Sequence, residues 1–287
     1  RLKNVVRLSA LADMLSLRWL GVDVVIGGVA SIDDVRSSEL TFSNKLLQQP
    51  VGVAIITREQ PKDFQLQHSG FIVADNPRLT FIEILNYLDS ALGFDTWNFP
   101  AVIDSSANIG SNAVIESGCV VGANSIIEHN VVLHSGTRIG KNCRIRSCSS
   151  IGGDGFGFER LDDGTPMRFP HLGGVVIGDN VEIGALNSIA KGALSDTFIA
   201  DYVKTDSLVH IAHNCFVNES ALITACAELS GGVTLGKRVW VGPNVAMMQK
   251  VTVGDDALIG LGAVVTKNVC ARTIVAGNPA KKIRDIL

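Results

Sequence analysis

Aliphatic residues recur every six positions through most of this chain, from Ile103 to Val265. The repeat is unbroken from 103 to 151, returns at 177, 183 and 189, and then continues from 199 to 265. Of these 24 positions, only Thr205 is not Val, Ile, Leu or Met. A small or β-branched residue usually stands four positions later, as at Ala107 and Ala263, and Gly, Asp, Asn and Lys are frequent between them.

A period of six fits neither an α-helix nor an up-and-down sheet, and it is typical of a hexapeptide β-helix. In that fold, short parallel strands separated by tight turns wind into a three-sided prism, with the aliphatic residue and the small residue both pointing inward. Three hexads make one coil of 18 residues, so the pattern predicts about eight coils and a prism roughly 38 Å long. A β-sandwich with coincidental spacing would not produce 23 matches in 24 positions.

Residues 1–100 lack the repeat and are predicted to form a small α/β domain. Apolar residues at helical spacing predict helices over 8–20 and 81–92, and continuous apolar runs at 51–56 and 70–74 predict buried strands. The β-helix is then expected over 101–270, with a tail at 271–287. Its longest interruption, at 152–176, is predicted to leave the prism as an extruded loop, and a shorter one at 191–197 adds four residues at one corner.

Composition and charge exclude several classes of protein. The 287 residues carry a net charge of −3, without the basic clusters that nucleic-acid binding needs. No apolar run is long enough to span a bilayer, and the first residues do not resemble a secretion signal. Three of the six cysteines (119, 143 and 215) occupy small inward positions, so we expect core thiols and a cytoplasmic protein. No metal site is expected, because His210, His213 and Cys215 lack a further pair of ligands.

Several motifs resemble a known enzyme family. They are Gly-Gly-Asp-Gly-Phe-Gly-Phe at 152–158, Val-Ile-Gly-Asp-Asn-Val-Glu-Ile-Gly-Ala at 176–185, Gly-Ala-Leu-Ser-Asp-Thr at 192–197 and Ile-Ala-His-Asn at 211–214. Together they resemble UDP-3-O-(3-hydroxyacyl)glucosamine N-acyltransferase, a lipid A enzyme. Leu-Thr-Phe at 40–42 and Asp-Asn-Pro-Arg-Leu-Thr-Phe at 75–81 are similar to its uridine-binding domain. The resemblance implies a left-handed β-helix, a nucleotide-binding N-terminal domain and a homotrimer with sites shared between copies, in lipopolysaccharide biosynthesis.

The chain also departs from that family. It lacks the Tyr that follows the family's uridine-binding Phe, and it has Ser-Ile-Ala-Lys at 188–191 where the family has Thr-Ile-Asp-Arg. The segments 260–269 and 275–283 resemble the closing coil of CoA-dependent hexapeptide acetyltransferases that act on nucleotide-linked amino sugars. The lipid A enzyme instead ends in a helical extension that serves an acyl carrier protein. The resemblance therefore favours acyl-CoA as the donor, with acyl carrier protein as the alternative.

Acyl transfer from a thioester to an amine needs a base and a donor that stabilises the oxyanion. Of the six histidines, His213 lies in a turn from which its side chain can project outward, and it aligns with the family's catalytic histidine. Gly231 lies one coil later, 18 residues on, and its backbone N–H is the candidate oxyanion donor. Each could instead be an ordinary turn residue.

Other candidates would bind the two substrates. For the nucleotide-linked amino sugar, the candidates are Phe42, Asn44, Lys45, Asp206, His210 and Asn214. Phe42 is expected to stack on the base, although a core phenylalanine is the alternative. For acyl-CoA, the candidates are Trp240, Lys267 and Lys281. A solvated surface, or for Trp240 a subunit contact, is the other interpretation.

Three hypotheses follow from the sequence. The first is an N-acyltransferase that uses acyl-CoA and acts on a UDP- or dTDP-linked amino sugar, with a short 3-hydroxyacyl group such as 3-hydroxybutyryl as one option for the acyl group. The second is the lipid A enzyme itself, supplied by acyl carrier protein. The third is a non-catalytic scaffold. A zinc hydrolase on the same fold would need three histidines that face one groove, and the spacing of the histidines at 129, 134 and 210 does not provide them.

Overall fold

The computed structural model describes residues 1–45 and 51–286, and the chain divides into two compact units. The first unit holds Arg1–Thr96 and Gly157–Pro170. The second holds Trp97–Phe156 and His171–Leu287. The hairpin inside the predicted loop 152–176 thus belongs with the N-terminal residues, whereas the two ends of that loop stay with the repeats.

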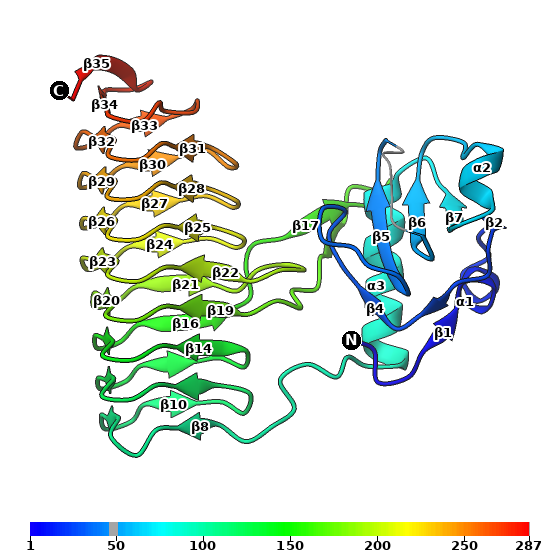
Figure 1. Ribbon diagram of the computed structural model, residues 1–287, viewed down its shortest axis with the longest axis horizontal. Helices are drawn as coiled ribbons and strands as arrows, with labels where there is room; N and C mark the ends of the chain where they lie inside the picture. The colour runs from blue at the N-terminus through cyan, green and yellow to red at the C-terminus, as the bar shows by residue number, and fades with distance from the viewer. Residues whose placement is uncertain (46–50, 287) are drawn as a thin grey trace. The chain divides into compact units, whose positions relative to one another are not determined.

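The second unit is a parallel β-helix with three faces, each a sheet whose neighbouring strands come from successive coils (Figure 1). In the described residues the first face contains β8 (Val102–Ile103), β11 (Val120–Val121), β14 (Thr137–Ile139), β19 (Val175–Ile177), β22 (Thr197–Ile199), β25 (Phe216–Val217), β28 (Thr234–Leu235) and β31 (Thr252–Val253). The second face contains β9 (Asn108–Ile109), β12 (Ile126–Ile127), β15 (Arg144–Ile145), β20 (Glu182–Ile183), β23 (Lys204–Thr205), β26 (Leu222–Ile223), β29 (Trp240–Val241), β32 (Leu258–Ile259), β34 (Thr273–Ala276) and β35 (Lys281–Asp285). The third face contains β10 (Val114–Ile115), β13 (Val132–Leu133), β16 (Ser150–Gly153), β21 (Ser188–Ala190), β24 (His210–Ile211), β27 (Glu228–Leu229), β30 (Ala246–Met247) and β33 (Val264–Val265).

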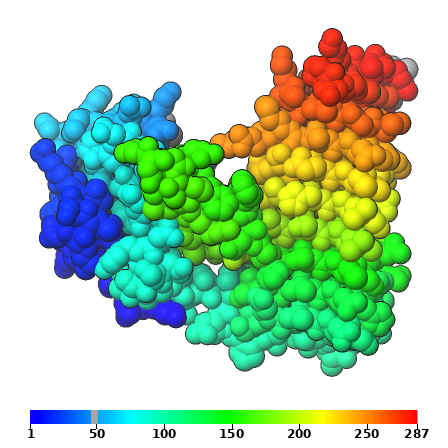
Figure 2. All heavy atoms as spheres, turned by 180° about the vertical axis from the view of Figure 1, so that it is seen from behind, coloured from blue at the N-terminus to red at the C-terminus, as the bar shows by residue number. Residues whose placement is uncertain are grey.

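Apart from β35, which folds back antiparallel to β34 at the end of the second face, neighbouring strands of each face are parallel, so residues one coil apart lie side by side. Ile211 pairs with Leu229, and Leu229 with Met247, across β24, β27 and β30. The aliphatic repeat fills the interior: from Val121 to Val265 its residues are buried in one continuous core, whose coils follow one another as bands of colour in Figure 2. The inward positions predicted from the six-residue period are therefore confirmed from Val121 onward, whereas Ile103 and Ile109 in the first coil are exposed, because no earlier coil covers them.

Thr205, the polar exception in the repeat, is buried with its own partner. Its hydroxyl donates to Asn187 Oδ1 at 2.9 Å and accepts the backbone N–H of Gly184 at 3.0 Å. Asn187 is the inward residue four positions after Ile183, and its amide donates to the carbonyl of Asp206 at 2.8 Å. Because a buried polar group costs free energy unless it is hydrogen-bonded, these two residues are compatible with the core only as a pair.

The three cysteines at inward positions are buried free thiols. Burial disfavours a thiolate, and it raises the pKa of Cys215 to about 12. The pKa values of Cys119 and Cys143 are raised for the same reason. These residues therefore act as small apolar groups in the core.

The first unit is built on a five-stranded sheet in the order β2-β7-β6-β5-β4. Its strands are β2 (Trp19–Gly21), β4 (Gly28–Val29), β5 (Glu39–Ser43), β6 (Ala54–Thr57) and β7 (Gly70–Val73), and β2 is antiparallel to β7. A two-stranded sheet joins β1 (Val6–Arg7) to β3 (Val25–Ile26). The helices are α1 (Leu8–Met14), α2 (Asp63–Leu66) and α3 (Pro77–Ala91). The predicted helix over 8–20 is too long, because the chain turns at Ser16, whose φ is 54°, and continues as β2.

The extruded hairpin, β17 (Phe158–Arg160) and β18 (Pro166–Arg168), packs on α3 within the first unit. Arg78 Nε donates to Glu159 Oε2 at 2.7 Å, and the Asn86 amide donates to the carbonyl of Arg168 at 3.2 Å. The Phe81 ring lies between those of Phe42 and Phe169, with centroid separations of 4.8 and 6.2 Å. The hairpin is thus an integral part of the N-terminal unit.

Two further properties of the described residues bear on function. Between residues 1–45 and 51–286, no helix combines the length and apolar character needed to cross a membrane. In the same residues, no cluster of three or more His, Cys, Asp or Glu side chains is arranged to hold a metal ion.

Candidate functional site

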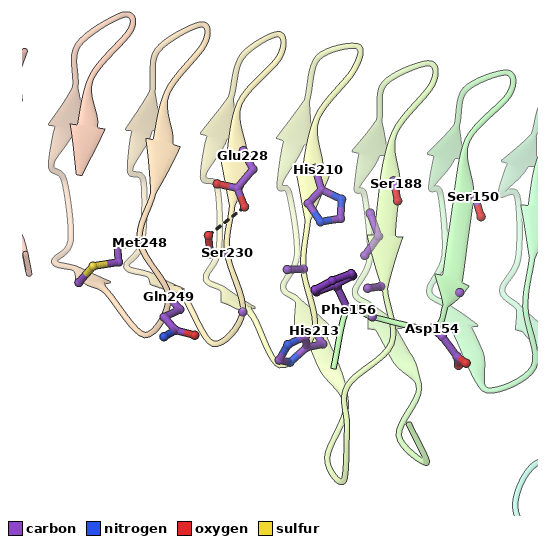
Figure 3. A pocket seen from close by; sticks show the side chains of 16 residues that line it. Ser150, Asp154, Phe156, Ser188, His210, His213, Glu228, Ser230, Met248 and Gln249 are labelled. Atoms are coloured by element: carbon purple, nitrogen blue, oxygen red, sulfur yellow. Dashed lines mark hydrogen bonds between the residues drawn. The ribbon is translucent and has the colours of Figure 1, made fainter. Parts of the chain in front are cut away.

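A pocket of about 600 Å³ opens on the third face of the β-helix. Its floor is a row of outward side chains in register from four neighbouring strands, which Figure 3 shows in order: Ser150, Ser188, His210 and Glu228. His213 and Gly231 line the pocket from the turns that follow β24 and β27. The 18-residue coil thus brings the predicted base and the predicted oxyanion donor into one cavity.

The hydrogen bonds of Asn214 determine which nitrogen of His213 carries a proton. Asn214 Oδ1 accepts the backbone N–H of Ala193 at 3.0 Å, and its Nδ2 donates to Ser195 Oγ at 3.0 Å, so the amide orientation is fixed. The same Oδ1 lies 3.0 Å from His213 Nδ1. Because this oxygen can only accept, Nδ1 carries the proton in the neutral ring. Nε2 is left with a free lone pair, as a general base requires.

The bulge at 191–197, the four-residue insertion seen in the sequence, supplies the groups that hold Asn214. Besides Ala193 and Ser195, Thr197 Oγ1 accepts the backbone N–H of Asn214 at 2.9 Å. Asn214 itself has a φ of 59°, in the left-handed region that Asn tolerates better than most residues. The break in the repeat therefore orients the imidazole through its neighbour.

Gly231 lies against the imidazole so closely that no side chain fits. A Cβ at this position would be 2.7 Å from His213 Cε1 and 2.8 Å from Nε2. Carbon atoms in ordinary contact are about 3.5–4.0 Å apart. Glycine is therefore required here for close approach, and its backbone lies directly beside the atom that would accept the proton.

The backbone N–H of Gly231 has no acceptor within residues 1–45 and 51–286. Among the described residues this N–H also lacks an acceptor at His213 and Gln249, the equivalent positions one coil to either side, whereas at some other equivalent positions it is occupied. The N–H of Ser135 donates to Glu116 Oε2 at 2.8 Å, and that of Lys237 donates to Asp255 Oδ1 at 2.8 Å. A donor at the pocket wall without a protein acceptor is suited to bind an oxyanion.

His171 packs on His213, although the sequence places it in the interrupted segment. The two rings meet edge to face with centroids 5.4 Å apart, and His171 is buried. Gly155 fits beside both, because a Cβ there would be 2.9 Å from His171 Nε2 and 2.9 Å from His213 Cβ. The glycine-rich segment thus closes around the base, with Asp154 and Phe156 on the pocket wall (Figure 3).

The predicted sugar-binding residues of the β-helix are only partly brought together. His210 lines the pocket, and Asn214 contacts His213. Asp206 instead lies where the chain turns from the second to the third face. Its carboxylate accepts the backbone N–H of Ser207 at 2.7 Å, and it does not line the pocket.

The remaining candidates lie elsewhere. Phe42 and the exposed Asn44 and Lys45 are in the first unit, at the end of β5. Trp240, 45% exposed, projects from the second face, and Lys281 belongs to β35 of the same sheet. Lys267 is 18 residues beyond the pocket residue Gln249, on the third face. The three candidates for CoA are thus divided between two faces.

Several pocket residues were missed by the sequence interpretation: Ser150, Asp154, Phe156, Ser188, Glu228, Ser230, Met248 and Gln249. Two of these could have been found by adding 18 to a candidate, since Glu228 follows His210 and Gln249 follows Gly231. Ser150 could not, because the interrupted repeat displaces its neighbour by 38 positions, to Ser188.

The chain is similar to known proteins in both sequence and fold. Residues 118–153 match the family described as bacterial transferase hexapeptide (six repeats). The chain is 30% identical to the UDP-3-O-acylglucosamine N-acyltransferase of Campylobacter lari over 305 residues, 98% of this chain and 95% of the relative. The protein of the same name from Bordetella parapertussis is 38% identical over 122 residues, which span 42% of this chain and about a third (34%) of the relative.

A solved structure supports the same assignment of the fold. LpxA from Acinetobacter baumannii is 26% identical, with a TM-score of 0.60, over 66% of this chain and 72% of that one. This likeness confirms the left-handed β-helix that the sequence predicts.

Proposed function

The chain belongs to the UDP-3-O-acylglucosamine N-acyltransferase family, and we propose that it transfers an acyl group from a thioester to the amine of UDP-3-O-acylglucosamine. The observation that carries this proposal is the arrangement at the pocket: His213 Nε2 with a free lone pair, beside the N–H of Gly231. The first supplies a base for the amine, and the second supplies a donor for the oxyanion.

His213 moves the proton in both halves of the reaction. As the amine nitrogen attacks the thioester carbonyl, Nε2 takes a proton from that nitrogen. The resulting imidazolium keeps its Nδ1–H on Asn214 Oδ1, which stabilises the charged ring. When the C–S bond breaks, the same Nε2–H returns the proton to the thiolate, so that the products are an amide and a free thiol.

Gly231 acts on the tetrahedral intermediate between those two steps. The carbonyl oxygen becomes an oxyanion, and the N–H of Gly231 donates a hydrogen bond to it. Glycine is needed because any Cβ would collide with His213 and hold the carbonyl away. Removing one oxyanion donor costs an acyl-transfer enzyme about 100- to 1000-fold in kcat.

The names of the relatives favour the second hypothesis from the sequence over the first. They specify an acylglucosamine linked to UDP, which makes the lipid A precursor the leading acceptor. Acyl carrier protein is accordingly our proposed donor, and acyl-CoA is the competing one. The division of Trp240, Lys267 and Lys281 between two faces also gives the CoA hypothesis no single binding surface.

The first unit is proposed to bind the nucleotide. Phe42 is only partly buried at the end of β5, and the exposed Asn44 and Lys45 follow it, so an aromatic face is accompanied by polar groups. We also propose that the protein is a homotrimer. Native mass spectrometry is expected to give three times the mass of the 30.5-kDa chain.

The test is a matrix of donors and acceptors. Acyl carrier protein and CoA, each charged with 3-hydroxybutyryl or a longer 3-hydroxyacyl group, are combined with UDP-3-O-acylglucosamine and other UDP- and dTDP-linked amino sugars. Thiol release gives the rate, and mass spectrometry gives the position and length of the added acyl group. We expect the highest kcat/KM for UDP-3-O-acylglucosamine with the carrier protein. Thiol release without an acylated amine in any combination would refute the transferase.

A further inference from the structure

A second hydrogen-bond network lies on the third face, separate from His213. His134 Nδ1 is 3.1 Å from Glu116 Oε1, and His134 Nε2 is 3.2 Å from Ser150 Oγ. The three residues come from successive coils, after β10, after β13 and on β16. A hydroxyl, an imidazole and a carboxylate linked in this order have the geometry by which an activated nucleophile is recognised.

The Glu116 carboxylate, at one end of this network, is held in place by the backbone. The backbone N–H of Ser135 donates to Glu116 Oε2 at 2.8 Å. This hydrogen bond is the main reason that the pKa of Glu116 lies below its ordinary value, and the charges of His134 and Lys191 lower it further. Because the carboxylate stays ionised, it accepts from Nδ1–H, and Nε2 is left to accept the proton of Ser150 Oγ.

The Ser150 hydroxyl, at the other end of the network, faces the pocket. Ser150 lines the same 600 Å³ cavity as His213, whereas Glu116 and His134, which are partly exposed on the two preceding coils, do not line it. Immediately after Ser150, β16 contains a bulge between Ile151 and Gly153. Bulges of this kind change the direction of a strand and often lie next to active sites.

Other polar ladders on the β-helix lack these features. Arg144 Nε donates to Glu128 Oε1 at 2.7 Å, and Ser147 Oγ donates to Glu128 Oε2 at 2.9 Å. There the central group is a carboxylate whose other oxygen is engaged by Arg144, no imidazole takes part, and none of the three residues lines the pocket. The Glu116–His134–Ser150 network is therefore more than one further set of surface hydrogen bonds.

We propose that Ser150 is a nucleophile, activated by His134 and positioned through Glu116, which gives this pocket a thioesterase activity distinct from transfer by His213. The nucleophile is inferred from geometry alone. The choice of an acyl thioester as substrate rests on the proposed function, because that function brings a thioester into this pocket.

The chemistry balances with water as the second substrate. Ser150 Oγ attacks the thioester carbonyl while its proton passes to His134 Nε2. The C–S bond breaks, the thiolate takes that proton and leaves as a thiol, and the acyl group remains as an ester on Oγ. Water then attacks the ester and gives a proton to His134. The C–Oγ bond breaks, Oγ regains the proton, and a carboxylic acid is released.

Covalent labelling tests the nucleophile. The full chain is treated with a fluorophosphonate, and the modified residue is identified by peptide mass spectrometry. We expect one label at Ser150 in the wild type and none in Ser150→Ala. Ser147→Ala is the matched control, because the Ser147 hydroxyl donates to Glu128 Oε2 and this residue does not line the pocket. It is expected to label at the wild-type rate.

Two further variants distinguish activation from support of the fold. His134→Gln is expected to slow labelling at least about 100-fold. Glu116→Gln is expected to slow it, since His134 Nδ1 loses the carboxylate that orients the ring. Glu116→Asp should restore part of the rate. A residue that only supports the fold would change the melting temperature without slowing the labelling of the folded protein.

Hydrolysis is measured with an N-acetylcysteamine thioester and no amine acceptor. Thiol release that falls at least about 100-fold in Ser150→Ala, with its circular dichroism melt unchanged, supports the proposal. An unlabelled wild type, or wild-type hydrolysis by Ser150→Ala, overturns it. Loss of transfer in His213→Ala, assayed in parallel with an amine acceptor, bears only on the proposed function.

Discussion

Replacing Gly231 by Ala tests the contact between the oxyanion donor and the base. The new Cβ would be 2.7–2.8 Å from two ring atoms of His213, so either the ring or the backbone must move by about 1 Å to restore ordinary contact. A displacement of that size near reacting atoms can cost about 100-fold in rate. We therefore expect kcat to fall by two to three orders of magnitude, of which the lost oxyanion geometry is one part.

Stability should change little in this variant, because the φ of Gly231 is not in the left-handed region. Its neighbour Gly232 provides the matched control. Gly232 has a φ of 73°, and a Cβ there would meet nothing nearer than Lys250 Cγ at 3.4 Å. Gly232→Ala is thus expected to lose about 1–2 kcal/mol of stability through its backbone, while the imidazole stays in place.

Thiol release with the best substrate pair gives kcat, and urea unfolding gives the free energy of unfolding. We expect Gly231→Ala to keep the wild-type free energy of unfolding but to have a low kcat, and Gly232→Ala to be less stable but to keep the wild-type kcat. If Gly231→Ala turned over at the wild-type rate, neither the contact nor the oxyanion role assigned to this residue could stand.

Three other outcomes follow from the structure. Asn214→Ala removes the acceptor of His213 Nδ1–H and should lower kcat about 10-fold or more. Asn244 also has a left-handed backbone (φ 55°), so Asn244→Ala is the control and should lower only the stability. Equal kcat values in the two variants would contradict the assigned tautomer. Phe42→Ala should raise KM for the nucleotide sugar about 10-fold without changing kcat, because about 1–3 kcal/mol of stacking energy is lost. An unchanged KM would contradict the proposal that Phe42 binds the base. In the folded protein the pKa of Cys215 is raised from 9.0 to about 12, so the buried thiol contributes its full stability below pH 9. This contribution is lost as the pH rises toward 12, at about 1.4 kcal/mol per pH unit. The free energy of unfolding in urea, measured from pH 8 to 11, should therefore decline less in Cys215→Ala than in the wild type.

The β-helix could be predicted because its rule of burial is local. Each hexad places one aliphatic residue inward, so the period alone identifies the core, and even Thr205 obeys the rule with Asn187 as its partner. The same spacing connects His213 to Gly231, since 18 residues make one coil. Helix 8–20 was predicted less well, because apolar spacing does not reveal the turn at Ser16.

The parts of the site that could not be predicted depend on the interrupted coils. Ser150 pairs with Ser188 only after the hairpin has left the prism, and His171 reaches His213 from the far end of that interruption. The link from Glu116 through His134 to Ser150 likewise combines spacings of 18 and 16 residues. A linear period cannot show such contacts, because side-chain direction at a bulge is set by the surrounding coils.

The most direct test of the central claim is the single-turnover rate of acyl transfer in His213→Ala, measured at saturating substrates with the acylated amine identified by mass. The structure predicts a rate at least about 100-fold below that of the wild type, with the melting temperature and oligomeric mass unchanged. A folded His213→Ala protein that forms the amide at the wild-type rate would contradict the account, because the base that lies beside the Gly231 amide would then be dispensable.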